Sequence, residues 1–296
     1  MQNFRKIGVF LNQEPGDNEA LTMAGKLAES FDSESILCVH VRGVESDPSA
    51  SPTESVDEVT RNVRERLPAK VAGRTRIEMH TSHGIADILK SARDESLDLI
   101  IVGRRQPHDQ LAVGSAFARL ARKAPCNVLV VPHQTHPHLS RIAVPVDGSP
   151  HSKMAVQTAI EIARLSGESG PQIVVQTIYE IGYGYQYAGL SFAEAVAQRE
   201  RKAQETLKAF LADVDHSGVN LSTVITCSDQ ATAAVYDLVS TKNLDMIVLG
   251  SRGLSATSAV LLGSFTERII VYSPVPVLVV KKKGETLRFL EALLNQ

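Results

Sequence analysis

An internal repeat that spans nearly the whole chain is the feature that most constrains its fold. Three segments of the first half recur in the same order in the second half. The matched pairs are Arg5–Asn12 with Ser140–Asp147, Leu97–Arg105 with Leu244–Arg252, and Ala124–Pro132 with Ser273–Lys281. A repeat of about half of the 296 residues indicates a duplicated domain, because solenoid repeats recur roughly every 20–50 residues.

The chain is therefore expected to divide into two similar domains and a short connection. Residues 1–132 form the first predicted domain, and residues 141–283 form the second. Residues 133–140 (HQTHPHLS) are rich in proline and histidine, which is typical of a linker. Residues 284–296 are predicted to form a C-terminal helical tail.

Each half alternates short apolar runs with amphipathic segments. In the first half the predicted strands are Ile7–Leu11, Ile36–Val41, Ile77–Thr81, Leu99–Val102 and Val128–Val131. In the second half they are Ile142–Val146, Ile173–Ile178, Leu221–Thr226, Met246–Leu249 and Val277–Val280. Strands that are apolar on both faces belong to a parallel sheet with helices on both sides. The sequence thus predicts an α/β fold with two tandem, doubly wound domains, each with a five-stranded parallel sheet.

Composition argues against several classes of partner. The 31 Lys and Arg residues nearly balance the 33 Asp and Glu residues, which leaves a formal net charge of −2. Such a chain has no general attraction to nucleic acid or to an anionic membrane. The 3 cysteines are far apart and form no CxxC pair, which argues against disulfides and thiolate metal sites. We recognise no signal peptide and no apolar run of about 18 residues, so a cytoplasmic location is expected.

The second half carries a stretch rich in glycine and hydroxyl groups directly after a predicted strand. Ligands of open parallel sheets bind beyond the carboxyl ends of the strands. Gly250 and Gly253 follow the fourth strand of this half and would let the backbone approach a ligand closely, because glycine has no Cβ. Gly263 and Ser264 open the last predicted helix, whose first N–H groups lack partners within the helix and favour a phosphate.

Polar side chains near this stretch extend the candidate site. Ser264 and Thr266 would add hydroxyl donors, and Gly263 would tolerate any positive φ angle that the loop requires. Asp147 ends the first strand of this half and would accept hydrogen bonds from an exocyclic amine or a ribose hydroxyl. The segment Asp147-Gly148-Ser149 is also typical of a simple turn followed by a helix cap, and both roles are compatible.

The spacing Gly250-x2-Gly253-x9-Gly263-Ser264 resembles the nucleotide-binding signature of the universal stress protein family. The strand end at Asp147 and the last strand, SPVPVLVV at 273–280, resemble the family as well, and the resemblance covers nearly the whole chain as two tandem copies. It implies that the second domain binds ATP, with or without Mg²⁺, in a regulatory or stress-response role. The resemblance assigns the adenine side to Pro145, Val146, Asp147 and Ile178, the ribose and phosphates to Leu249, Gly250, Arg252 and Gly253, and the phosphate cradle to Gly263, Ser264, Phe265 and Thr266.

The resemblance also implies how the two sheets meet. Their last strands, Val128–Val131 and Val277–Val280, would pair with each other, so that one chain mimics the dimer of single-domain relatives. This pairing would cover two strand edges that otherwise promote aggregation. Further self-association into a homo-oligomer is left open, and the sequence names no protein partner.

The first half departs from the glycine pattern. Asn12 stands in place of Asp147, and Gln106 stands in place of Gly253. Because glutamine adopts positive φ angles less readily than glycine, we expect a degenerate nucleotide site in the first domain. An anion could still bind there through Arg104, Arg105 and Ser115.

One alternative to ATP binding stays open. Asp229 falls where the family usually has a glycine after the third strand, and its carboxylate would repel a phosphate. The chain could then be a non-nucleotide ligand-binding or protein-interaction module with degenerate pockets. A metal could bind to His133, His136 and His138, but no cysteine or carboxylate cluster lies near them in the sequence, and no metal site is predicted.

Binding is expected rather than metabolic catalysis. Phosphoryl transfer needs a positioned metal, a nucleophile and charge neutralisation. The sequence offers hydroxyl groups but no evident base with a pair of metal-holding carboxylates, and it contains no GxxxxGK[ST] motif. Slow ATP hydrolysis or autophosphorylation on serine or threonine stays open.

Overall fold

The computed structural model describes most of both halves of the chain. The described residues are 4–12, 15–41, 56–80, 85–104, 114–136, 138–168, 170–254 and 262–282. The predicted tail at 284–296 lies outside them.

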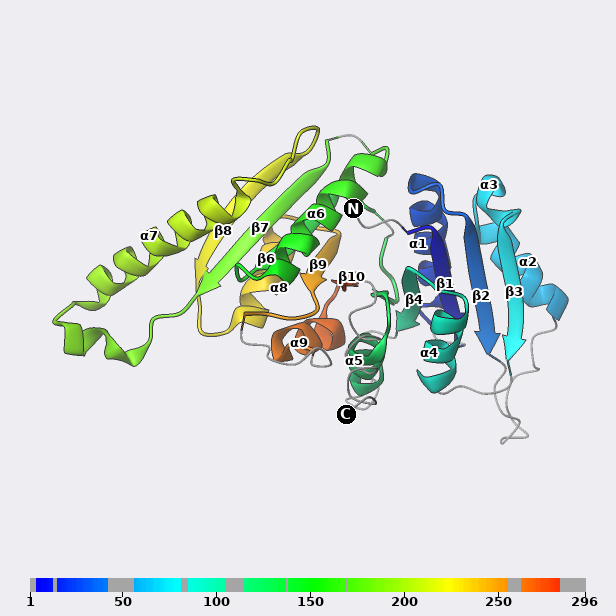
Figure 1. Cartoon of the computed structure of the whole chain (residues 1–296), viewed down its shortest axis with the longest axis horizontal. Helices are drawn as coiled ribbons and strands as arrows, with labels where there is room; N and C mark the ends of the chain where they lie inside the picture. The colour runs from blue at the N-terminus through cyan, green and yellow to red at the C-terminus, as the bar shows by residue number, and fades with distance from the viewer. Residues whose placement is uncertain are drawn as a thin grey trace, which may run out of the picture.

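The first half folds as a doubly wound α/β unit (Figure 1). Its strands are β1 (Lys6–Leu11), β2 (Ser35–Val41), β3 (Thr75–His80), β4 (Leu99–Arg104) and β5 (Asn127–Pro132). Its helices are α1 (Asp17–Ser30), α2 (Val56–Arg66), α3 (Ala69–Ala72), α4 (Ile85–Asp94) and α5 (Gly114–Lys123). Every residue of β4 and β5 is buried, as expected for strands that are covered on both faces. The five predicted strands of this half are therefore confirmed.

The second half repeats this order with longer outer elements. Its strands are β6 (Arg141–Val146), β7 (Gln172–Tyr179), β8 (Asn220–Cys227), β9 (Met246–Gly250) and β10 (Val277–Val280). Its helices are α6 (Pro150–Leu165), the 3₁₀ helix η2 (Tyr183–Ala188), α7 (Phe192–Leu211), α8 (Ala231–Thr241) and α9 (Ser264–Tyr272). Helix α7 begins with a capping box, in which the Ser191 hydroxyl accepts from the Glu194 N–H and the Glu194 carboxylate accepts from the Ser191 N–H.

The ten strands within the described residues form one continuous sheet. Their order is β3-β2-β1-β4-β5-β10-β9-β6-β7-β8, so the two halves are arranged as mirror-ordered sheets that meet at β5 and β10. These two strands are antiparallel, with Leu129 opposite Leu278, whereas the other neighbouring strands are parallel. The predicted pairing of the two sheets through their last strands is confirmed.

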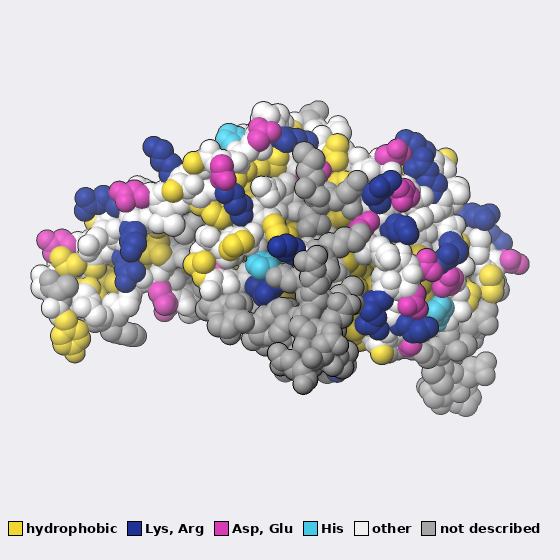
Figure 2. Space-filling view, in the orientation of Figure 1, with side chains coloured by type: hydrophobic (Ala, Val, Ile, Leu, Met, Phe, Trp, Pro, Cys, Tyr) yellow, Lys and Arg dark blue, Asp and Glu magenta, His cyan; other side chains and the backbone are white. Residues whose placement is uncertain are grey.

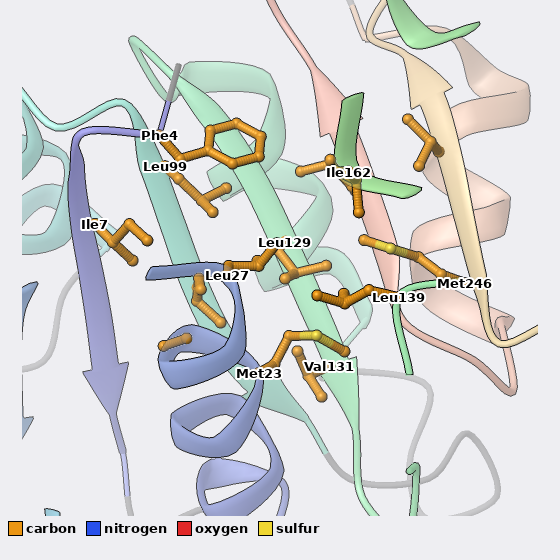
Figure 3. Close-up of a cluster of buried hydrophobic side chains, with 14 of the residues drawn as sticks. Phe4, Ile7, Met23, Leu27, Leu99, Leu129, Val131, Leu139, Ile162 and Met246 are labelled. Carbon is orange, nitrogen blue, oxygen red and sulfur yellow. The ribbon is translucent and has the colours of Figure 1, made fainter. Parts of the chain in front are cut away.

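Helices cover both faces of the sheet. Residues of α1, α2, α3, α6 and α7 pack on one face, and residues of α4, α5, α8 and α9 pack on the other. The first of these cores runs without interruption across the boundary between the halves, where Met23 and Val131 lie near Leu139 and Met246 (Figure 3). Leu139 is only 1% exposed, so the end of the predicted linker is part of the core.

Charged side chains are mixed on the surface. On the face that Figure 2 shows, lysine and arginine lie among aspartate and glutamate over both halves. Among the described helices, none combines the length and the apolar character needed to cross a bilayer. Among the described residues, the most exposed large apolar side chain is Tyr187, in η2.

Candidate functional site

A cavity of about 280 Å³ lies at the carboxyl ends of β6, β7 and β9, against the first turns of α8 and α9. All twelve candidate site residues of the second half line it, and three residues that the sequence did not indicate join them. The lining consists of Pro145, Val146, Asp147, Ser152, Gln176, Ile178, Ala231, Leu249, Gly250, Arg252, Gly253, Gly263, Ser264, Phe265 and Thr266. Segments more than a hundred positions apart in the chain therefore meet around one space, as the position of ligand sites in parallel sheets predicts.

Asp147, at the end of β6, is hydrogen-bonded to the loop that contains Gly250 and Gly253, called the glycine loop below. Its Oδ2 accepts a hydrogen bond from the Leu254 N–H at 2.9 Å, and its Oδ1 accepts from the Ser149 N–H at 3.0 Å. Burial alone would raise the pKa of this carboxyl, but the hydrogen bonds from Ser149 and Leu254 outweigh burial and lower the pKa below its ordinary value. Each carboxylate oxygen can still accept a second hydrogen bond from a ligand.

The turn after Asp147 also caps the next helix. Gly148 has a φ of +84°, which a residue with a side chain rarely adopts. The Ser149 hydroxyl accepts from the Ser152 N–H at 3.1 Å and so caps α6, with Pro150 in its first turn. The interpretation of this segment as a turn and helix cap is confirmed.

The first two glycines of the motif are required by contacts within the protein. A Cβ on Gly250 would lie 2.7 Å from the carbonyl carbon of His151, at the start of α6. A Cβ on Gly253 would lie 2.6 Å from Oδ2 of Asp147. The absence of a side chain at both positions thus lets the glycine loop pack on α6 and on Asp147, in addition to any approach of a ligand.

Gly263 differs from these two glycines. Its φ is −63° and its ψ is 139°, which is extended backbone, so the positive φ angle considered at this position is not used. A Cβ here would meet only the Thr266 Oγ1, at 3.7 Å, which is ordinary contact. The protein itself therefore leaves room for a side chain at Gly263, the N-cap residue of helix α9.

The first turn of α9 presents backbone donors to the cavity. The Glu267 N–H bonds to the Gly263 carbonyl at 2.9 Å and is the first N–H with a partner inside the helix. By helix geometry the N–H groups of residues 264–266 have no acceptor within α9, and Gly263 supplies no side-chain cap. Such an end carries partial positive charge and suits an anion.

Thr266 has a structural role that the sequence did not indicate. Its hydroxyl was expected to donate to a phosphate, but its Oγ1 donates to the Gly250 carbonyl at 3.2 Å instead. The Gly263 N–H also bonds to the Ser251 carbonyl, at 3.2 Å. These two bonds hold the start of α9 against the end of β9. Ser264 is exposed and lines the cavity without such a bond among those described.

The opposite wall of the cavity is mostly apolar. Pro145 and Val146 end β6, Leu249 lies near the end of β9, and Ile178 and Phe265 close the wall from β7 and α9. Gln176 is the polar exception and is 1% exposed. Because side chains alternate along a strand, Gln176 and Ile178 share one face of β7, and this spacing is the signal that could have added Gln176 to the candidate residues.

Asp229 does not belong to the lining of the cavity. It follows β8, it is exposed, and Ala231 rather than Asp229 contributes to the wall. An exposed carboxylate outside the lining is screened by solvent, so the repulsion of a phosphate expected from the sequence is weak.

In the equivalent region of the first half, Gly103 packs against α1 as Gly250 packs against α6, and Arg104 has a structural role. A Cβ on Gly103 would lie 2.4 Å from the carbonyl carbon of Gly16, so this glycine serves the packing of α1. Arg104 was a candidate for holding an anion, but it is 3% exposed and its guanidinium donates to the Ser273 carbonyl of the second half. That expectation is wrong for Arg104, because its charge is engaged at the junction of the two halves. Arg105 and Gln106 lie outside the described residues, as does the side chain of Ser115.

Two of the three histidines in the predicted linker each pair with a single carboxylate. His133 Nδ1 lies 3.1 Å from Glu19 Oε1, and His138 Nδ1 lies 3.5 Å from Glu168 Oε2. Within the described part of the chain, no three His, Cys, Asp or Glu side chains are grouped so that they could hold a metal ion.

Comparison with known proteins agrees with the duplication. A model of the universal stress protein family matches residues 3–132 and again residues 138–281. Universal stress protein MJ0531 from Methanocaldococcus jannaschii is 32% identical over 143 residues, which are 48% of this chain and 82% of that protein.

Solved structures extend the likeness of the fold to the whole chain. Protein PA1789 from Pseudomonas aeruginosa, described as functionally unknown, has a TM-score of 0.68 at 18% identity, covering 100% of this chain and 99% of its own. A universal stress protein from Archaeoglobus fulgidus has a TM-score of 0.57 at 18% identity, covering 96% of this chain and 100% of its own. At this identity the likeness concerns the fold.

Proposed function

The chain belongs to the universal stress protein family, and from this premise we propose that its second domain binds ATP as a regulatory ligand in a stress response. One observation carries the proposal. The twelve residues that the family signature assigns to nucleotide binding line a single cavity, although they come from four separate segments of the chain.

The chemistry of the two walls supports a nucleotide. The apolar wall around Pro145, Ile178 and Leu249 would hold the flat face of a base. The start of α9 would hold the phosphates through backbone N–H groups and the helix dipole, and Arg252 also lines the cavity. Asp147 has acceptor capacity left for a ribose hydroxyl or an amine. Bound Mg²⁺ would neutralise charge on the phosphates.

Regulation is proposed rather than catalysis. Among the described residues, Asp147 is the one carboxylate that lines the cavity, and it already accepts two backbone hydrogen bonds. A transferase site of the usual kind needs a base and carboxylates that hold a metal. The residues described around the cavity offer binding groups and no such set.

The size of the cavity favours a second candidate. At about 280 Å³ it lies just below the range of roughly 300–1,000 Å³ that is usual for ligand sites. A smaller, non-nucleotide ligand with an anionic group would satisfy the same helix end, and this candidate keeps the site but changes its ligand.

Titration calorimetry of the full chain with ATP tests the proposal, beside native mass spectrometry of the freshly purified protein. We expect one ATP site per chain, because the first half lacks the glycine loop. Two equal sites would contradict the assignment to the second domain alone. No affinity for ATP, together with a co-purified small anion, would support the second candidate.

A further inference from the structure

Gln176 has an amide whose orientation is fixed by the protein. It lies in β7 and is 1% exposed. Its Nε2 donates to the hydroxyl oxygen of Thr226, on β8, at 3.0 Å and to the backbone carbonyl of Ala234, on α8, at 3.1 Å. A backbone carbonyl only accepts hydrogen bonds, so the nitrogen must face Ala234. Reversing the amide would place Gln176 Oε1 against the Ala234 carbonyl oxygen, and both of these atoms are acceptors.

The other end of this amide is an acceptor without a protein donor. Gln176 Oε1 is buried, and it has no hydrogen-bond partner among the described residues. Both hydrogens of Nε2 are already used, so the only hydrogen-bonding capacity left on the amide is that of an acceptor. Buried acceptors of this kind are uncommon, because losing their water without a replacement donor is unfavourable.

The position of this acceptor points to a ligand. Gln176 lines the same cavity as Pro145, Ile178 and Phe265, which form the apolar wall. The start of α9, where the phosphates would lie, contributes Gly263 and Ser264 to the same cavity. A single oriented acceptor among apolar side chains is the arrangement by which a pocket selects one pattern of donors over another.

We propose that Gln176 determines the specificity of the pocket by accepting a hydrogen bond from an N–H group of the bound base, namely the exocyclic amine of adenine. This proposal rests on nucleotide binding in the second domain. A base with a carbonyl oxygen in that position would set an acceptor against Oε1, and a base with only hydrogen there would leave Oε1 buried and unsatisfied. Thr226 and the Ala234 carbonyl act as positioning groups for the amide.

The experiment compares ATP with purine riboside triphosphate, which has hydrogen in place of the amine and is otherwise the same molecule. Calorimetry on the unmodified full chain should show ATP binding about ten- to a hundredfold more tightly, since one buried hydrogen bond is lost and its acceptor is left unsatisfied. The variant Gln176→Leu should bind the two nucleotides with nearly equal affinity. Each ratio compares two ligands on one protein, so a general loss of affinity cancels.

Gln172→Leu is the matched control. Gln172 begins the same strand, at the end remote from the cavity, and the variant should keep the full preference for ATP. If Gln176→Leu does not fold, Thr226→Val removes one of the two groups that hold the amide and should reduce the preference without abolishing binding.

The outcomes separate this proposal from the proposed function. If the unmodified protein binds both nucleotides equally, nucleotide binding stands and the role of Gln176 is overturned. A Gln176→Leu variant that keeps the preference overturns it as well. If the unmodified protein binds neither nucleotide, the proposed function fails, and the role of Gln176 fails with it.

Discussion

The guanidinium of Arg104, at the end of β4, donates a hydrogen bond to the carbonyl oxygen of Ser273, which ends helix α9 in the other half of the chain. Arg104 is 3% exposed, and burial lowers its pKa to about 10. A cation at a helix C-terminus meets the negative end of the helix dipole and an unpaired carbonyl. The first half therefore supports the helix whose opposite end borders the candidate site.

The second half returns the same kind of contact. Lys281, directly after β10, donates through Nζ to the carbonyls of Arg122 and Ala124 at the end of α5, at 3.1 and 2.5 Å. Its backbone N–H bonds to Asn127 Oδ1 at 2.9 Å. Each half thus supplies a buried cation to the last helix of the other half, in addition to the antiparallel pairing of β5 with β10. The two halves are expected to unfold together.

The first prediction concerns Arg104. Arg104→Met removes the hydrogen-bond donor of the buried Ser273 carbonyl. We therefore expect the free energy of unfolding to fall by about 1–3 kcal/mol. Removing the buried charge offsets part of a larger loss, because desolvating a cation is unfavourable. Urea denaturation followed by circular dichroism measures the change. The control is Arg119→Met, the same substitution at an exposed position of α5, which should cost less than about 0.5 kcal/mol. Equal effects at both positions would contradict the assigned role.

Sequence patterns predicted most of the fold because the burial of a strand is indicated by the composition of its own few residues. A strand that is covered on both faces must be apolar throughout, so runs such as Leu99–Val102 and Met246–Leu249 are recognisable as buried strands. The duplication then gives the order of the elements. The contact between Arg104 and Ser273 joins positions far apart in the sequence, and nothing in the local composition distinguishes a buried arginine from a surface arginine.

In the candidate site, too, residues of one local motif were predicted and residues that depend on distant contacts were not. Spacing and resemblance brought together the glycines and the start of α9, because those residues belong to one motif. Gln176 was missed because its amide is oriented by Thr226 and the Ala234 carbonyl, which lie on two other elements. Gly250 and Gly253 also have a packing role that the sequence did not indicate, since a Cβ at these positions would meet His151 and Asp147.

The second prediction concerns an ion pair between the halves. Arg122, in the last turn of α5, pairs with Glu267, in the first turn of α9. Arg122→Gln would leave the Glu267 charge uncompensated close to the proposed phosphate site, and we expect ATP affinity to fall about two- to fivefold. The effect is modest because the two side chains are 37% and 30% exposed. Adding Glu267→Gln should restore affinity in calorimetry, and a double variant as weak as Arg122→Gln alone would refute the electrostatic cause.

The third prediction separates two glycines of the motif by their effect on stability. Gly250→Ala places a Cβ 2.7 Å from the His151 backbone, so it should lower the free energy of unfolding by about 1–3 kcal/mol without any ligand present. Gly263→Ala meets no close neighbour, and it should cost only about 0.5 kcal/mol through weaker capping of α9. Urea denaturation of both ligand-free variants checks the difference. A larger loss for Gly263→Ala would show that the packing argument is wrong.

The fourth prediction is a pH dependence at Asp147. Its pKa is lowered in the folded protein below the ordinary value of 3.8, so its contribution to stability is complete above that value and is lost as the pH falls through the lower folded pKa. Asp147→Asn keeps one acceptor oxygen but turns an amide toward the second N–H, and it should cost about 1 kcal/mol at pH 7. Denaturation of both proteins between pH 2 and 7 should show this difference shrinking only below about pH 4. A difference that stays constant over that range would mean that the charge of Asp147 has no part in it.

The last prediction concerns ATP affinity at the start of α9. Gly263→Val sets a branched side chain between the phosphates and the first N–H groups of the helix. Valine adopts the φ of −63° and ψ of 139° found here, so the variant should fold, and circular dichroism verifies this. Each charge-assisted hydrogen bond that is lost costs about 1.5–3 kcal/mol, so losing two weakens ATP binding roughly a hundredfold or more in calorimetry. Gly114→Val, at the start of α5 in the first half, is the matched control and should leave ATP affinity unchanged, while Ser264→Ala should cost less because the backbone donors remain. A folded Gly263→Val protein that binds ATP like its parent would place the phosphates elsewhere.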